Sequence, residues 1–102
     1  MSDLRLDMFI EESIQEATDW AVFQKNGPGT WSLLTAQIAN FLDAQRKAGN
    51  LAGVSSEEAF IIRCDATLNT QDVIDAGQLI VEVGWAKYKP AEFIIIRVSS
   101  KQ

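Results

Sequence analysis

The sequence predicts an α+β fold, with two helices packed on one face of a small, mainly antiparallel sheet. In the first half of the chain, apolar residues recur at the three- and four-residue spacings of an amphipathic helix. In the second half, runs rich in valine and isoleucine alternate with turn residues, which favours strands. Helices followed by strands are typical of α+β domains. The 102 residues, 47% hydrophobic and 23% charged, suit a single domain, residues 1–102, with one modest core.

The first helix is predicted from about Asp3 to Phe23. Its apolar stripe consists of Leu6, Phe9, Ile10, Ile14, Ala17, Trp20 and Ala21. Glu11, Glu12 and Glu16 on the same helix raise the question of a carboxylate metal site. Adjacent residues point apart on a helix, however, and the sequence shows no second cluster to complete a coordination shell. We therefore interpret these glutamates as a solvated helix face.

The second helix is predicted to follow a loop at residues 24–29, because Asn-Gly and Pro-Gly pairs favour turns. Thr30 is predicted to cap this helix and Gly49 to end it. Its buried stripe is predicted to comprise Trp31, Leu34, Ile38, Phe41 and Leu42.

The first strand is predicted at residues 59–65, after a single turn that the capping-box spacing from Ser55 to Glu58 opens. The polar connection that follows contains Asn69-Thr70, which is able to cap a short helical turn. A second strand is predicted at Gln78–Ala86. Both helical stripes need an apolar partner, so the sheet is expected to pack against them through Phe60, Ile62, Val81 and Val83, opposite Ile14, Trp20, Ile38 and Phe41.

The last strand is predicted at residues 91–98, after Lys87–Pro90 interrupts the chain. It is apolar on both faces, so burying one face in a lone domain leaves an apolar face or a bare edge, which promotes association. Pro90 cannot donate to a ladder and marks a break. We therefore expect an intermolecular strand made of Glu92, Phe93, Ile94, Ile95, Ile96, Arg97 and Val98. In an isolated chain it is expected to fold back beside residues 79–85 or to swap between molecules.

Composition argues against several classes of function. The sequence has no histidine and a single cysteine, Cys64, which removes the commonest general base and any intrachain disulfide. No catalytic residue, metal ligand, cofactor or small-molecule substrate is predicted, and Cys64 is interpreted as a buried structural residue. A net charge of −5 argues against nucleic-acid binding, and no apolar run approaches the ~20 residues of a membrane span. The acidic Asp65, Asp72 and Asp75 are assigned to turns and caps.

Three aromatic and two basic residues remain to be placed. Trp20 and Trp31 are predicted to lie in the core, whereas Trp85 follows a glycine near a strand end and is expected to be partly exposed at an interface. Arg46 and Lys47 oppose the dipole at the end of the second helix, and they also qualify as a local basic contact for an acidic partner.

The ordered set of motifs resembles the C-terminal domain of contractile tail sheath proteins, from phage tails and related injection machines. The resemblance runs through Phe9-Ile10-Glu11-Glu12, Trp20-Ala21-Val22-Phe23, Phe41-Leu42, Gly49-Asn50-Leu51-Ala52-Gly53, Arg63-Cys64-Asp65 and Lys89-Pro90-Ala91-Glu92-Phe93. It covers nearly the whole chain. Family members are usually several times longer, and the loop at residues 24–29 is glycine-rich where the family tends to be acidic.

The resemblance implies a structural, non-enzymatic role. Sheath subunits stack as six-fold rings around an inner tube protein, joined by strand exchange, and the C-terminal domain forms the inner layer. Arg46 and Lys47 would then face the tube. The implied location is the bacterial cytoplasm during assembly, and then a virion tail or injection-machine sheath. The sequence leaves a different class open, a small cytoplasmic adaptor domain that binds a partner strand without polymerising.

Overall fold

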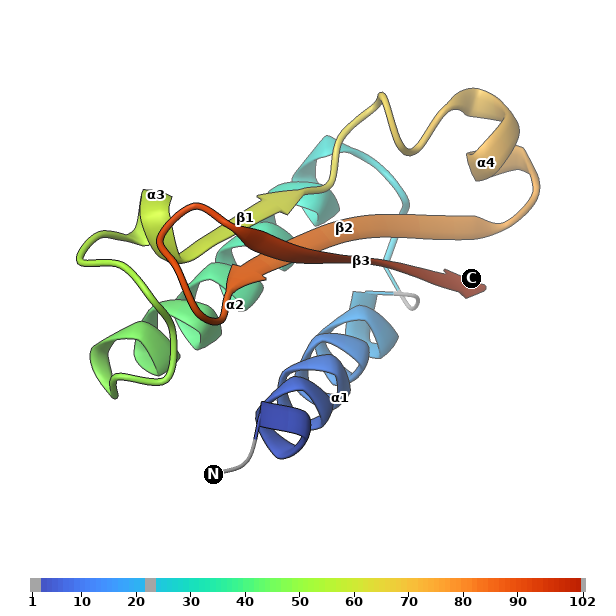
Figure 1. Cartoon of the computed structure of the whole chain (residues 1–102). Coiled ribbons are helices and arrows are strands. Elements are labelled where there is room, and N and C mark those ends of the chain that lie inside the picture. Colours follow the sequence, from blue (N-terminus) through green and yellow to red (C-terminus); the bar gives the residue numbers. More distant parts are fainter. Residues whose placement is uncertain (1–2, 22–23, 102) are drawn as a thin grey trace.

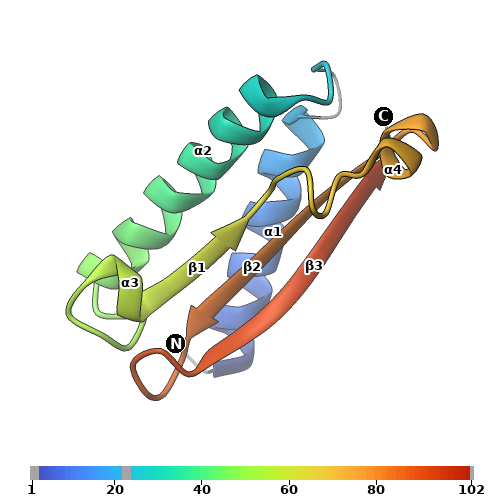
Figure 2. The same ribbon diagram turned by 90° about the horizontal axis from the view of Figure 1, so that it is seen from above.

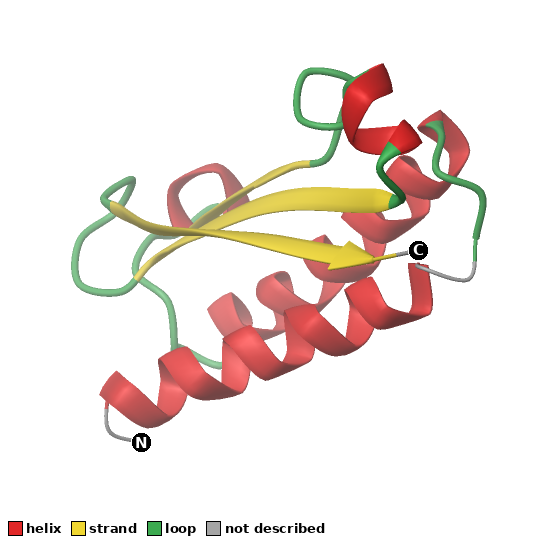
Figure 3. Ribbon diagram, turned by 90° about the vertical axis from the view of Figure 1, so that its right-hand side faces the viewer, coloured by secondary structure: helices red, strands yellow, loops and turns green. Residues whose placement is uncertain are grey.

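The computed structural model describes residues 3–21 and 24–101 and confirms the α+β prediction. Its sheet has three antiparallel strands in the order β1-β2-β3. Both long helices lie on the same side of this sheet (Figure 1), and Figure 3 shows the two layers from the side. The elements are α1 (Asp3–Ala21), α2 (Pro28–Lys47), α3 (Ser56–Ala59), β1 (Phe60–Arg63), α4 (Gln71–Asp75), β2 (Gln78–Ala86) and β3 (Phe93–Lys101).

Helix α1 buries a narrower stripe than the sequence predicts. Its buried residues are Leu6, Ile10, Ile14, Thr18 and Ala21. Trp20 is 38% exposed, so its assignment to the core is wrong. Thr18 is buried in this stripe instead. Its hydroxyl donates to the Ile14 carbonyl (2.7 Å), so it keeps a hydrogen bond when buried. The predicted end of the helix at Phe23 lies outside the described residues.

Helix α2 begins three residues earlier than predicted. Gly27 is the N-cap and Pro28 stands in the first turn, where a missing N–H costs no hydrogen bond. Thr30 is inside the helix and donates to the Lys25 carbonyl (2.6 Å), so its predicted capping role is wrong. The end at Gly49 is confirmed: its φ of +83° is the left-handed conformation that glycine adopts freely after a helix.

The core lies between the helices and the inner face of β2. The inward residues Leu79, Val81, Val83 and Trp85 are fully buried. The predicted sheet residues Phe60, Ile62, Val81 and Val83 join one cluster with Ile14, Ile38 and Phe41, as expected. Phe41 is only half-buried, and its ring packs edge-on against Phe9 of α1, with centroids 5.5 Å apart.

Trp85 contradicts its prediction, because it is fully buried rather than partly exposed. Its position opposite Phe60 in the sheet turns the indole toward the helices. The indole Nε1 donates to Asp7 Oδ1 (3.1 Å), while Lys87 Nζ lies 2.6 Å from Asp7 Oδ2. This cluster fastens α1 to the end of β2.

Two backbone features shift the last strand from its predicted bounds of residues 91–98. Ala91 has a φ of +62°, which is incompatible with a strand, so β3 begins at Phe93. At its other end, Ser99, Ser100 and Lys101 pair with Ile80, Leu79 and Gln78, which extends β3 by three residues. As expected for an isolated chain, the segment folds back beside β2.

Candidate assembly interface

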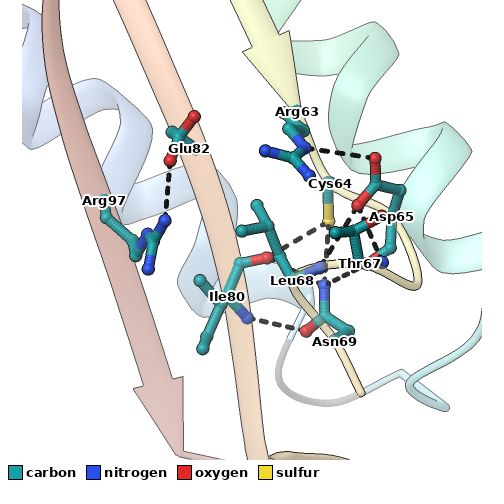
Figure 4. A network of polar contacts seen from close by, with 9 residues as sticks. All are labelled: Arg63, Cys64, Asp65, Thr67, Leu68, Asn69, Ile80, Glu82 and Arg97. Carbon is teal, nitrogen blue, oxygen red and sulfur yellow. Dashed lines mark hydrogen bonds and ion pairs between the residues drawn. The ribbon is translucent and has the colours of Figure 1, made fainter.

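The central strand β2 extends beyond both ends of β1, and other groups of the chain form hydrogen bonds with it there. At one end, the Asn69 side chain occupies the place of a neighbouring strand: its Nδ2 donates to the Ile80 carbonyl (2.9 Å) and its Oδ1 accepts from the Ile80 N–H (2.8 Å). Figure 4 shows the amide facing β2 in this way. At the other end, the Ala52 N–H donates to the Ala86 carbonyl (2.9 Å). The β1 side of β2 therefore offers no vacant place to another strand at either position.

Cys64 and Asp65 support the turn that carries Asn69. The Cys64 thiol donates weakly to the Ile80 carbonyl (3.6 Å), and Asp65 Oδ1 accepts from the backbone N–H of Thr67 (3.0 Å). Burial raises the pKa of the Cys64 thiol to about 11. These contacts agree with a structural cysteine and a turn-forming aspartate, but Cys64 is half-buried rather than buried as predicted. From the sequence, Asn69 is predicted only to cap a helical turn, because nothing near it in the chain reveals that Ile80 lies opposite.

The contacts at Ile80 and Ala86 fix which way each backbone group of the sheet points. In an antiparallel ladder, successive residues direct their N–H and C=O groups to opposite sides. Ile80 and Ala86 point toward β1, so the odd-numbered residues of β2 point toward β3. Their partners on β3 are the even-numbered ones, since Val83 pairs with Ile96. The N–H and C=O groups directed away from β2, at the free edge of β3, therefore belong to Phe93, Ile95, Arg97, Ser99 and Lys101.

The free edge of β3 is the longer of the two sheet edges. β1 has four residues, whereas β3 has nine, and it borders the sheet along its whole length (Figure 2). An unpaired edge of this length is a template for strand addition. Of the predicted interface segment, Glu92–Val98, residues Phe93–Val98 lie in this edge strand, whereas Glu92 precedes it.

A groove of about 320 Å³ runs beside this edge on the helix side of the sheet. Its lining residues are Glu11 and Gln15 from α1, and Ile96, Arg97, Val98 and Ser99 from β3. Ile96 and Val98 are partly buried against the core and supply the apolar part of the lining. The groove provides room for side chains of a strand added to β3.

The opposite face of the sheet is covered by neither long helix. Gly84 lies there between Ile61 and Ile95, which are 50% and 57% exposed, and a Cβ at this position would be 3.0 Å from each side chain. The neighbouring row carries an ion pair between Arg97 and Glu82, 2.9 Å apart (Figure 4). The Arg97 side chain therefore points away from the helices.

The two basic residues of the predicted tube contact differ in accessibility. Arg46 pairs with Asp43 (2.8 Å) and donates to the Val54 carbonyl (3.2 Å), so it holds the loop after α2. Lys47 also lies near Asp43 (3.3 Å), but its side chain is 70% exposed. Of the pair, Lys47 is the residue that is accessible to a partner.

The acidic helix face agrees with its predicted solvated role. Glu11, Glu12 and Glu16 are all exposed. Within residues 3–21 and 24–101, no three His, Cys, Asp or Glu side chains are arranged to hold a metal ion. Over the same residues, no helix combines the length and hydrophobicity that crossing a bilayer requires.

The sequence profile of the family described as "Phage tail sheath C-terminal domain" matches residues 4–101. The chain belongs to this family. The resemblance noted from the motifs is thereby confirmed, and membership makes the chain a sheath protein domain of the phage tail and contractile injection system class, with a structural and non-enzymatic role. A search of curated protein sequences finds no significant match.

Two solved assemblies contain chains similar to this one. A chain of the anti-feeding prophage baseplate, solved by cryo-electron microscopy with six-fold symmetry, is 36% identical over 96% of this chain, with a TM-score of 0.76. A chain of the PVC sheath complex, an extracellular contractile injection system in the contracted state, is 40% identical over 92%, with a TM-score of 0.75. The match spans only 28% and 27% of those chains, respectively.

Proposed function

We propose that this chain acts as the inner-layer domain of a contractile sheath subunit, which self-assembles into six-fold helical rings around an inner tube. Neighbouring subunits are joined by a strand that adds to the free edge of β3, within the segment Glu92–Val98. Family membership supports the structural role, and the likeness to a PVC sheath complex chain supports assembly with other copies.

The observation that carries the proposal is the direction of the backbone groups on β3. The groups of Ile95, Arg97 and Ser99 point away from β2, whereas contacts from Asn69 and Ala52 occupy the opposite side of the sheet's central strand. Backbone hydrogen bonds to such an edge give a directional linkage, and side chains that enter the adjoining groove fix its register. A lattice linked in this way can change its packing while the subunits stay joined.

The inner tube is the second partner proposed. Arg46 and Lys47 form a basic pair on a chain with a net charge of −5, and Lys47 is well exposed. We expect Lys47→Glu to weaken co-assembly with the tube protein in a salt-dependent way while leaving stability nearly unchanged. Arg46→Glu is a poorer probe, because it also removes the contacts to Asp43 and Val54.

Strand addition is tested by two proline substitutions at adjacent positions. Ile95→Pro removes an N–H that points out of the sheet, so it is expected to leave the folded domain largely intact and to abolish sheath formation. Ile96→Pro removes an N–H that points toward β2 and is expected to destabilise the domain itself. Each variant is co-expressed with the tube protein, sheath length is measured by negative-stain electron microscopy, and stability is measured on the isolated chain.

If Ile95→Pro builds sheath of normal length, strand addition at β3 does not join the subunits. A folded Ile95→Pro chain without sheath supports the proposal. If subunits instead exchanged the whole of β3, the exchanged strand would pair through the backbone groups that face β2. Sheath would then still form in the Ile95→Pro variant.

A further inference from the structure

The residues that line the groove beside β3 indicate which kind of side chain binds in it. A strand added to β3 sends alternate side chains to the two faces of the sheet. Those on the helix side enter the groove between α1 and β3, where Ile96 and Val98 offer an apolar surface. The stem of an entering side chain therefore meets hydrocarbon first.

The α1 wall of the groove presents hydrogen-bond acceptors. Gln15 Nε2 already donates to Asp19 Oδ1 (2.9 Å) and to Ser100 Oγ (3.3 Å), so the amide is oriented with its donor occupied. Its Oε1 accepts no hydrogen bond within the part of the chain that the structure describes. Glu11 adds a carboxylate, which suits a donor equally.

Glu11 has no cationic partner among residues 3–21 and 24–101. The nearest candidate in the groove lining, Arg97, pairs with Glu82 on the other face of the sheet. A strand that brings a carboxylate into the groove would meet repulsion from Glu11. One that brings an amino or guanidinium group would find an unused acceptor.

We propose that the groove between α1 and β3 receives a lysine or arginine side chain of the incoming strand, contributed by a neighbouring sheath subunit. The stem packs on Ile96 and Val98, and the cationic end reaches Glu11 and Gln15, as long basic side chains do when they lie along apolar surface. This inference rests on the proposed strand addition at β3. It makes Glu11 a determinant of which strand is accepted and in which register.

The test uses the full chain and fluorescein-labelled nine-residue peptides of alternating valine and threonine. The central position of the valine face carries lysine, norleucine or glutamate, and binding is measured by fluorescence polarisation at low salt. We expect the lysine peptide to bind about two- to five-fold more tightly than the norleucine peptide, and the glutamate peptide to bind weakest. Glu11→Gln is expected to remove the preference for lysine, and Glu11→Lys to reverse it.

Glu12→Gln is the matched control, because Glu12 is exposed on the same helix but does not line the groove. It is expected to keep the preference for lysine. Equal binding of lysine and norleucine peptides to the unmodified chain, or a lysine preference that survives Glu11→Gln, would overturn the inference.

The two proposals fail in different ways. Ile95→Pro should weaken all three peptides alike, because it removes a backbone bond to the added strand. If it does not, or if no peptide binds, strand addition at this edge is contradicted. If Ile95→Pro weakens binding of all three peptides but Glu11→Gln leaves the preference for lysine unchanged, strand addition is supported and the proposed role of the groove is contradicted.

Discussion

The Asn69 side chain pairs with the backbone of Ile80 through both of its polar atoms, at 2.9 Å and 2.8 Å. Asn69 is only 1% exposed, so neither atom of the pair has an easy replacement in water. The amide extends the sheet beyond the end of β1 with a side chain in place of a strand. Of the two remaining sheet edges, β3 is the longer, with nine residues against four in β1.

Replacing Asn69 by leucine is expected to cost about 2–4 kcal/mol of unfolding free energy. The leucine has a similar volume, but it leaves the Ile80 N–H without that partner and the Ile80 carbonyl with only the weak Cys64 thiol donor. Buried unsatisfied groups cost about 1–3 kcal/mol each. Urea denaturation measures the change. Gln71→Ala, at an exposed site nearby, serves as the control and should stay within about 0.5 kcal/mol of the unmodified chain. Equal stabilities for the two variants would mean that the amide is dispensable.

The ion pair between Asp7 and Lys87 gives the second prediction. Their side chains are 22% and 11% exposed, so water replaces the lost partner poorly. Asp7→Asn keeps an acceptor for the Trp85 indole but removes the charge opposite Lys87, and is expected to cost about 1–3 kcal/mol. Urea denaturation followed by tryptophan fluorescence measures the cost.

A double-mutant cycle with Lys87→Met separates the pair from its surroundings. A coupling energy near zero would show that the two groups do not stabilise each other. Asp19→Asn is the control on the same helix, because Asp19 is exposed and should contribute little.

Cys64 predicts how stability changes at alkaline pH. Burial raises the pKa of its thiol from 9.0 to about 11, so the native state holds the proton more tightly than the unfolded chain. The resulting stability is fully present below pH 9 and is lost as the pH rises toward 11. Unfolding free energies at pH 8 and 10.5 should therefore fall more for the unmodified chain than for Cys64→Ala. Parallel falls in the two proteins would show that the thiol titrates alike in both states.

Much of the fold follows from periodicity in the sequence. The bounds of β2 were predicted without error at Gln78–Ala86, because a long apolar run between Gly77 and a charged loop defines both ends. Three of the misplaced features, at Trp20, Thr30 and Trp85, share one cause. In each case the outcome depends on a second residue that contacts or replaces the first one in the fold. That second residue is either distant in the sequence or fits the local sequence pattern equally well.

The sequence predicts which residues form the candidate interface, but not which of their backbone groups face outward or which groove lies beside them. Apolar residues on both faces of the strand were enough to single out residues 92–98. The direction of their backbone groups was not predictable, because it depends on Asn69 and Ala52 contacting β2 from remote parts of the chain. The groove likewise requires Glu11 and Val98 to line the same surface, which only the packing of α1 on the sheet determines.

Ala91, in the connection between β2 and β3, lies in the left-handed region with a φ of +62°. Its backbone N–H donates to the Glu58 carbonyl (2.8 Å). This conformation costs an L-residue about 1–2 kcal/mol, and glycine avoids that cost while giving up some unfolded-state entropy. Ala91→Gly is therefore expected to raise the unfolding free energy by about 0.5–1 kcal/mol, measured by urea denaturation. Ala66→Gly, at an exposed turn residue without a positive φ, should lower it by a similar amount. A loss of stability in Ala91→Gly that matches the loss in Ala66→Gly would show that the backbone at Ala91 is not held in the left-handed region.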